Sequence, residues 1–257
     1  YWQRDKKGSL TYTSLVEKLT DYKMSNEEIW DILEYQGDVY FRSFAAIYKY
    51  EKGTVVPVIT QVTNAMEVHK GELYVSLGQQ GIFNLNGNRE WIPLGTSEIL
   101  QGKTIIEMEG YGEQLFLGTR DALYTCNDSK CFLFKDNELN NLLEKYELNH
   151  ILKISENELL IATVKNGIIH YNLISGKIKI YNRNSGLQNN TVLGMAENQG
   201  KLWLGLDNGI DVLDLNAPIN FFTDDTGELG AVYDIVHFKN EIFLASNTGV
   251  YQFANGG

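Results

Sequence analysis

The chain has 257 residues, of which 43% are hydrophobic, so it is long and apolar enough to bury a substantial core. Its net charge of −11 provides no basic surface for nucleic acid and disfavours contact with an anionic membrane surface. No apolar run approaches the roughly 20 residues that cross a bilayer. The chain opens on strand-like residues from Tyr1 rather than on Met, which favours an excerpt or a processed product of a longer protein.

One pattern recurs along the chain: an apolar alternation, a short polar turn with a small residue, and a second apolar alternation. The small residue of the turn falls at intervals of 35 to 45 residues, at Ala46, Gly81, Ala122, Gly167, Gly209 and Gly249. Turns such as Asn166–Gly167 and Asn208–Gly209 predict two-residue hairpins in which both residues have positive φ. A repeat with a period near 40 residues indicates a repeat fold.

Each unit divides into four strands. An apolar strand precedes the hairpin, and a second turn, marked by Gly53, Gly87 or Gly176, leads to a fourth strand. Pro57 and Pro93 lie within such fourth strands and Pro218 directly precedes one, which places the fourth strand at a sheet edge, where proline is tolerated. Four antiparallel strands in each period predict an all-β fold, a single β-propeller domain over residues 1–257. A β-sandwich is the alternative, but it requires no fixed period.

The number of blades stays open. Six units carry the first three strands, and residues 1–14 align with the last two strands of a preceding blade. Residues 10–14 would supply the missing fourth strand of a six-bladed ring. Alternatively, the chain is most of a seven-bladed ring with further strands outside it.

Two segments interrupt the repeat. Apolar residues at helical spacing predict a helix within 135–150, with Asp136 or Asn137 as its N-cap. Residues 16–26 form a similar but less regular helix candidate.

The chain has two cysteines, Cys126 and Cys131, with four turn-forming residues between them and apolar strands on either side. This spacing places them opposite each other in a hairpin, where a disulfide is feasible and two free thiols are equally compatible. A metal would need ligands that two thiolates do not supply. A disulfide would favour an oxidising compartment.

Residues 185–215, SGLQNNTVLGMAENQGKLWLGLDNGIDVLDL, resemble the two-component regulator propeller repeat. The resemblance rests on the leader 187–192, the Trp203 strand and the glycine turn that follows, and other units match only in part. It implies the extracytoplasmic sensor of a Bacteroidetes regulator with two propellers, a triple-tyrosine domain, a membrane helix and an output domain. Many such regulators sense oligosaccharides. The resemblance implies a periplasmic or extracellular location and transfers no catalytic residue.

In a propeller, the turns between second and third strands share one face with the connections between blades, around the mouth of the channel. The ligand-binding candidates are the polar and aromatic residues of those turns: Arg42, Phe44, Gln79, Gln80, Arg120, Asp121, Lys165, Asn166, Asp207, Asn208 and Asn247. These residues are chosen by their position in the predicted topology and not by their chemistry. Planar polar groups and aromatic rings of this kind suit a sugar.

Other conspicuous residues favour structural roles. Trp203 aligns with Tyr40, Tyr74, Phe116, Leu160 and Phe243, so it is expected to pack in the core. His69, His150, His170 and His237 occupy different positions in their units, so no metal site is expected. The acidic segment 222–230 lacks the spacing of a calcium loop. No nucleophile motif occurs, although carboxylates from different blades could still meet.

These observations favour a non-catalytic sensor with no cofactor, whose ligand is an oligosaccharide or another small molecule. Its further partners would be other domains of the same protein and a second copy in a homodimer, with neither nucleic acid nor direct membrane contact. A protein-interaction scaffold is the main alternative, and a polysaccharide lyase or hydrolase is a more distant one.

Overall fold

The structure is a computed structural model that describes residues 2–4, 6–20, 22–24, 26–85, 90–94, 98–127, 130–215, 217, 226–239 and 241–253. Its strands form consecutive antiparallel sheets in which each strand pairs with its neighbours in the sequence. The first two four-stranded sheets are β3 (Asp31–Tyr35), β4 (Asp38–Arg42), β5 (Ile47–Glu51) and β6 (Thr54–Ile59), then β7 (Ala65–His69), β8 (Glu72–Ser76), β9 (Ile82–Leu85) and β10 (Trp91–Pro93).

The third sheet is β11 (Glu107–Tyr111), β12 (Gln114–Gly118), β13 (Leu123–Cys126) and β14 (Cys131–Leu133), and the fourth is β15 (Leu148–Ser155), β16 (Glu158–Thr163), β17 (Ile168–Asn172) and β18 (Ile178–Tyr181). The fifth is β19 (Val192–Asn198), β20 (Lys201–Leu206) and β21 (Gly209–Asp214), and the sixth is β22 (Val232–Phe238), β23 (Glu241–Ser246) and β24 (Val250–Phe253). A hairpin of β1 (Trp2–Arg4) and β2 (Leu10–Tyr12) precedes them.

These sheets confirm the predicted β-propeller architecture. Pro57 lies in β6 and Pro93 in β10, which are edge strands as proline requires. The fourth strand predicted at 219–222, with Pro218 before it and Gly87 in an earlier turn, falls outside the described residues.

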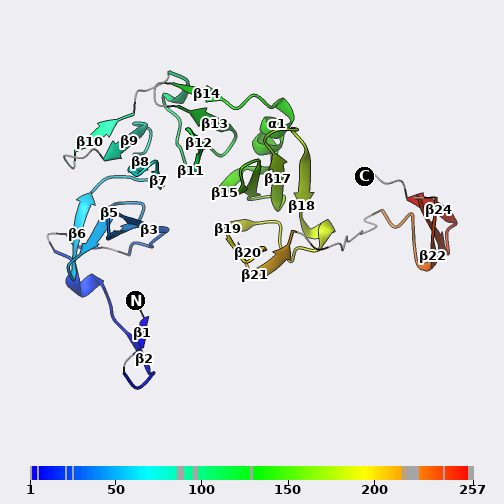
Figure 1. Cartoon of the computed structure of the whole chain (residues 1–257), viewed down its shortest axis with the longest axis horizontal. Helices are drawn as coiled ribbons and strands as arrows, with labels where there is room; N and C mark the ends of the chain where they lie inside the picture. Colours follow the sequence, from blue (N-terminus) through cyan, green and yellow to red (C-terminus); the bar gives the residue numbers. More distant parts are fainter. Residues whose placement is uncertain are drawn as a thin grey trace.

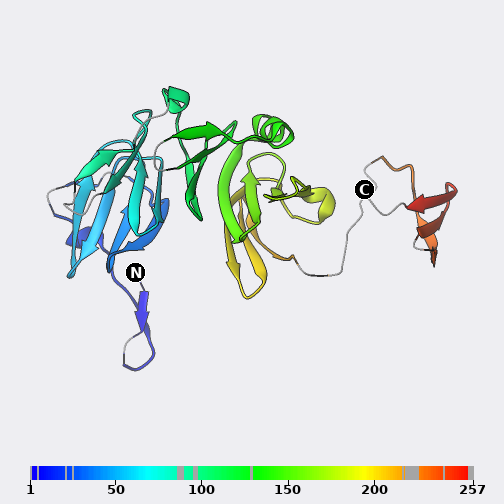
Figure 2. The same ribbon diagram turned by 45° about the horizontal axis from the view of Figure 1, so that its top comes forward.

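The first five sheets follow one another around an arc, with β3, β7, β11, β15 and β19 facing its middle (Figure 1). The fourth strands of the first four sheets lie on its outside. The sixth sheet lies apart from this arc in both views (Figures 1 and 2). Strand β2 pairs with β1, as Tyr12 opposite Trp2 indicates, so residues 10–14 do not complete the sixth sheet in this structure. The number of blades in the closed ring stays a prediction.

Buried side chains fill the spaces between consecutive sheets of the arc, since no sheet of this size buries both faces alone. Tyr40, Tyr74, Phe116 and Leu160 are all buried, as their aligned positions predict. Phe243, on the sixth sheet, is only half-buried, and Trp203 departs furthest from the prediction. Its side chain is 46% exposed, because the face of β20 that carries it has no sheet packed against it in this structure.

The two-residue turn in which both residues have positive φ lies at a different place from the one that the sequence predicts. Gln36 and Gly37, between β3 and β4, have φ of 53° and 81°, which is typical of a type I′ turn. Asn166 has no positive φ, and Gly167 alone is left-handed at 72°. The loop between β16 and β17 is longer than two residues, and Thr163 Oγ1 closes it by accepting a hydrogen bond from Asn166 N at 2.9 Å. The prediction for Asn208 is wrong for another reason: Leu206 pairs with Gly209, so the two-residue turn is Asp207–Asn208, and Asn208 has no positive φ.

The helix predicted within 135–150 is present as α1 (Asn137–Tyr146). Asp136 is its N-cap, since its side chain accepts a hydrogen bond from Leu139 N at 3.0 Å. The helix predicted at 16–26 is not found: among its described residues the helical element is the 3₁₀ turn η1 (Val16–Lys18). Leu19 and Thr20 then lie along β6, with Thr20 N donating to Val55 O at 3.1 Å. Further 3₁₀ turns are η2 (Glu98–Leu100) and η3 (Arg183–Ser185). Within the described residues, no helix has the length and apolarity to cross a membrane.

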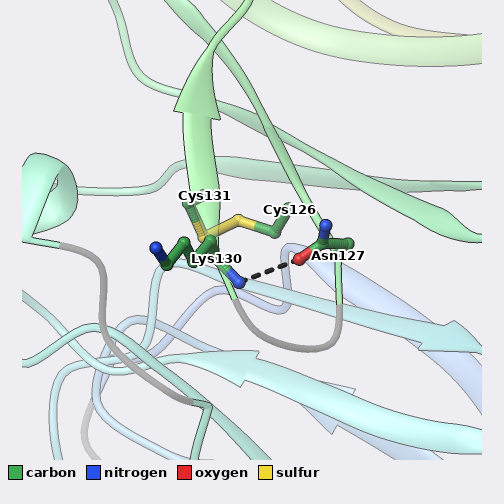
Figure 3. The surroundings of a disulfide bond; sticks show 4 residues. All are labelled: Cys126, Asn127, Lys130 and Cys131. Carbon is green, nitrogen blue, oxygen red and sulfur yellow. Dashed lines mark hydrogen bonds between the residues drawn. A yellow bond between two sulfur atoms is a disulfide. The ribbon is translucent and has the colours of Figure 1, made fainter.

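Cys126 and Cys131 form a disulfide, which resolves the alternatives that their spacing leaves open. They end β13 and begin β14, where they are directly paired across the hairpin. Figure 3 shows the turn that they close, in which Lys130 N donates to the side chain of Asn127 at 2.9 Å. The bond therefore reinforces the edge of the third sheet.

Replacing both cysteines, as Cys126→Ala with Cys131→Ala, is expected to lower the free energy of unfolding by about 2 kcal/mol, because the bond closes only a short loop. Urea unfolding measures this loss. Reductant should destabilise the parent chain by a similar amount and leave the double variant unchanged, and equal stability of both proteins would contradict the prediction.

Candidate functional site

The turns that carry the candidate residues lie against the connections between sheets, as the topology predicts. Phe44 O accepts a hydrogen bond from Thr63 N at 3.1 Å, and Arg120 O accepts one from Leu148 N at 2.8 Å. Asn190 O accepts from Gly167 N at 2.7 Å in the same manner. These bonds join the turns of the first, third and fourth sheets to the segment that enters the next sheet. We call the edge of the arc that carries these turns and connections the mouth.

Two aromatic rings form an exposed pair at the mouth. Phe44 is 55% exposed, and its ring lies edge-to-face with that of Trp30, 5.2 Å away and 52% exposed. Ile29, next to Trp30 in the sequence, and Val62, in the connection between β6 and β7, are also exposed. Trp30 was not among the predicted residues. Its place in the connection before β3 was the available signal, because those connections share the face of the turns.

The side chains of Gln79 and Gln80 are exposed in the turn between β8 and β9, and Gln80 Nε2 donates to Gln61 Oε1 at 3.5 Å. Each side-chain amide has two N–H donors and an acceptor oxygen, so one long hydrogen bond leaves further donors and acceptors for a ligand. Gln61 adds a third amide that the prediction omitted.

Arg42 is placed differently from the other candidates. It is only 7% exposed, and its Nε lies 2.5 Å from Asp31 Oδ2. Its Nη1 also donates to Thr63 O at 3.1 Å, at the start of the next sheet. The guanidinium thus braces the first sheet against the second, beneath the mouth.

Arg120 and Asp121 are exposed at the turn of the third sheet. Arg120 Nη1 donates to Leu148 O at 3.1 Å and to Asn149 Oδ1 at 2.9 Å. Asn149 in turn donates to Val192 O at 3.1 Å. Asp121 Oδ1 accepts from Thr119 Oγ1 at 2.7 Å. These contacts link the third, fourth and fifth sheets along the mouth and fix the direction of the arginine.

The remaining candidates continue along the fourth and fifth turns. Lys165 is exposed and pairs with Glu147, and Asn166 Oδ1 accepts from Asn182 Nδ2 at 3.0 Å. Asn208 Oδ1 accepts from Asn189 Nδ2 at 2.8 Å. These side chains share the mouth but are spread around it, so they do not converge on one point.

Asp207 is exposed, and its backbone N donates to Thr191 O at 3.3 Å. Asn247 lies on the sixth sheet, where its side chain accepts from Ala231 N at 2.8 Å. Because that sheet stands apart from the arc, the structure does not bring Asn247 together with the other candidates.

A second group of polar side chains lies on the inner strands, and the prediction did not name it. Asp31 on β3, Glu67 on β7, and Glu107 and Glu109 on β11 come from three successive sheets. Burial, and then the charge of Glu109, raise the pKa of Glu67 to about 7. Burial, followed by the charges of Asp31 and Glu109, raises the pKa of Glu107 well above its usual value.

The fourth sheet contributes basic groups to this region. Glu109 Oε1 accepts a hydrogen bond from the backbone N of Lys153 at 2.9 Å. Burial raises the pKa of Glu109, and this bond and the charge of Lys153 partly offset the rise. Burial lowers the pKa of His150, on the same strand β15. The described residues include no group of three or more His, Cys, Asp or Glu that is arranged to hold a metal.

No family model and no curated protein matches the chain. Its fold is that of a β-propeller: the WD40 β-propeller domain of Doa1 superposes with a TM-score of 0.54 at 14% identity, covering 91% of this chain and 81% of that one.

Two further solved structures are extracellular domains of putative hybrid two-component systems from B. thetaiotaomicron. BT3049 superposes with a TM-score of 0.64 at 17% identity over 97% of this chain, and BT4673 with 0.60 at 17% identity over 89%. The chain spans 38% and 32% of their lengths. At this identity the likeness establishes the fold. Such regulators are also the class that residues 185–215 resemble.

Proposed function

We propose that the chain is the propeller segment of an extracytoplasmic sensor in a two-component-type regulator, and that it binds a glycan fragment at its mouth without transforming it. The observation that carries this proposal is the exposed Trp30–Phe44 pair, with exposed amides in the turn of the next sheet. The fold shared with extracellular domains of putative hybrid two-component systems supports the sensor role. The disulfide supports an oxidising compartment.

The chemistry of the mouth suits a neutral, hydroxyl-rich ligand. Aromatic rings offer flat apolar surface to the C–H faces of a sugar ring, while Gln61, Gln79 and Gln80 offer donors and acceptors to its hydroxyls. Two charged side chains near the pair in sequence or contact are already engaged: Arg42 is paired with Asp31, and Glu27 accepts a hydrogen bond from Ser43 Oγ at 2.5 Å. An aromatic surface with a few directed polar groups is typical of a small-ligand site.

Binding of an oligosaccharide is expected to raise the melting temperature of the intact ectodomain, since a ligand that binds only the folded state stabilises it. A panel of oligosaccharides identifies the ligand by thermal shift, and calorimetry then gives its affinity. Trp30→Ala and Phe44→Ala should each weaken binding about tenfold or more, because a ring that carries the contact contributes 1.4 kcal/mol or more.

Phe132→Ala is the matched control, because Phe132 is an aromatic residue on β14 with a similar exposure of 48%. It should leave the affinity unchanged. If no oligosaccharide shifts the melting temperature while a protein partner binds to the exposed apolar residues Trp30 and Phe44, the chain is an interaction scaffold and the proposal of a sensor is wrong.

The carboxylates of the inner strands favour one other function, acid–base chemistry on a glycoside. A glutamic acid with a raised pKa is the group that protonates a leaving oxygen in such reactions. The same oligosaccharides, incubated with the protein and assayed for new reducing ends, decide this. The proposal of a non-catalytic sensor expects binding with no turnover, and turnover that Glu107→Gln abolishes would overturn it.

A further inference from the structure

The carboxylate of Glu27 accepts hydrogen bonds from three hydroxyl groups. Tyr22 OH donates to its Oε1 at 2.9 Å, and Ser43 Oγ and Tyr48 OH donate to its Oε2 at 2.5 Å and 2.6 Å. Ser43 lies between β4 and β5, Tyr48 lies on β5, and both are buried. Hydrogen bonds to an ionised acceptor are stronger than those between neutral groups. Glu27 therefore fastens the segment before β3 to the first sheet.

This contact joins the two segments that carry the exposed aromatic pair. Trp30 follows Glu27 by three residues, and Phe44 directly follows Ser43. The two rings lie edge-to-face, 5.2 Å apart. Trp30 N also donates to Arg42 O at 2.8 Å, so a backbone bond and a carboxylate together hold the segment of Trp30 against the turn of Phe44.

The equivalent hydroxyl of the third sheet acts within its own turn, since Thr119 Oγ1 donates to Asp121 Oδ1 at 2.7 Å. Ser43 also closes its own turn, because its Oγ accepts a hydrogen bond from Ala46 N at 3.0 Å. Its hydroxyl proton, however, is directed to Glu27, outside the sheet. The bond to Glu27 is thus an addition that closure of the turn does not require.

The two tyrosines that bind Glu27 remain protonated donors. The hydrogen bond to Glu27, and then burial, raises the pKa of Tyr22. Burial, followed by the hydrogen bond to Glu27, raises the pKa of Tyr48 well above its usual value. Their rings also contact each other edge-to-face, with centroids 5.6 Å apart. The contact is therefore both polar and apolar, and it holds over the whole physiological pH range.

We propose that Glu27 is a positioning residue of the mouth, which fixes Trp30 against Phe44 so that the two rings form a surface that is ordered before a ligand binds. The inference rests on the proposed function for the class of ligand, but not for the order of the ring pair. A surface that is already ordered binds more tightly, because less side-chain freedom is lost on binding.

The motion of the Trp30 ring tests this role without any ligand. The chain has four tryptophans, so Trp2→Phe, Trp91→Phe and Trp203→Phe together leave Trp30 as the single emitter. In this background, time-resolved fluorescence anisotropy should detect little nanosecond motion of the ring. Glu27→Ala should increase the amplitude of that motion several-fold.

Two milder variants and a control separate positioning from a loss of folding. Glu27→Gln should keep the ring fixed, since an amide oxygen can accept from Ser43 and Tyr48 while the amide N–H donates to Tyr22. Tyr48→Phe keeps the buried ring and removes one of the two bonds to the sheet, so it should loosen Trp30 to a smaller extent. Glu28→Ala is the matched control, because Glu28 is the exposed carboxylate next in the sequence.

Calorimetry with maltohexaose, cellohexaose and xylohexaose relates the fixed ring to affinity. For each oligosaccharide that binds, Glu27→Ala should weaken the affinity roughly threefold to tenfold. The same substitution should have little effect in a Trp30→Ala background, because a residue that acts through this ring loses its role with the ring. A residue that only stabilises the fold would affect both backgrounds equally.

A mobile Trp30 in Glu27→Ala, with a fixed Trp30 in Glu27→Gln and Glu28→Ala, supports the proposal. A ring that is equally fixed in all of these proteins overturns it, and so does equal weakening of binding by Glu27→Ala with and without Trp30. If none of the three oligosaccharides binds while the ring still depends on Glu27, the positioning role is supported and the glycan ligand of the proposed function is not. Circular dichroism verifies that each variant is folded.

Discussion

Glu67→Gln is expected to stabilise the protein at pH 8 and to have little effect at pH 5. The carboxyl of Glu67 lies on the inner strand β7, and burial together with the charge of Glu109 raises its pKa from 4.5 to about 7. Each tenfold change in proton affinity corresponds to about 1.4 kcal/mol, so ionisation destabilises the folded state by up to about 3 kcal/mol. Glutamine keeps the shape of the side chain and removes this charge.

The sign of the pH dependence follows from proton binding. Between pH 4.5 and about 7 the folded protein holds a proton on Glu67 that the unfolded chain releases. This group therefore makes the protein less stable as the pH rises through that window, and the penalty is complete above it. The variant should lose this part of the pH dependence.

Urea unfolding at pH 5 and pH 8 measures both effects. Glu34→Gln is the matched control, since Glu34 is an exposed carboxylate on the inner strand β3, where a substitution is expected to change stability by less than about 0.5 kcal/mol. Equal effects of the two substitutions, or a Glu67→Gln effect that does not depend on pH, would contradict the role assigned to burial.

The architecture was predictable because it repeats. Each unit carries the same alternation, and the edge prolines Pro57 and Pro93 independently fix which strand lies outside. The mouth was predictable for the same reason, because turn positions follow from strand order. The type of each turn was not predictable. A hydroxyl such as that of Thr163 can close a longer loop, and the dipeptide Asn166–Gly167 does not distinguish that loop from a two-residue turn.

The proximity of the inner-strand carboxylates could not be predicted from any single repeat unit. Glu67 and Glu107 occupy alternate positions on first strands and look like ordinary solvent-facing residues of half-buried strands. They come close to each other only because three sheets turn around one centre, a relation between units that the period of a repeat does not encode. Arg42 is a similar case. Its turn position predicts exposure, but the length of its side chain lets it reach Asp31 and the next sheet.

Gly167→Ala is expected to destabilise the protein by roughly 3 to 5 kcal/mol, the sum of a left-handed backbone and an overpacked contact. Gly167 has a φ of 72°, and a Cβ placed on it would lie 2.0 Å from the backbone oxygen of Tyr181. Backbone cannot move aside as a flexible side chain does. The turn would have to lift away from the connection after β18, which would weaken the bond between Gly167 N and Asn190 O.

Gly37→Ala separates the two contributions. Its φ of 81° is equally left-handed, but a Cβ there meets no atom within 4 Å, so only the backbone term of about 1 kcal/mol applies. Urea unfolding of both variants gives the difference, and equal losses would contradict the close contact. Because this turn also holds Asn166 against Asn182, Gly167→Ala should disturb the fourth part of the mouth, whereas Gly37→Ala, in the turn at the other end of β4, should leave the mouth intact.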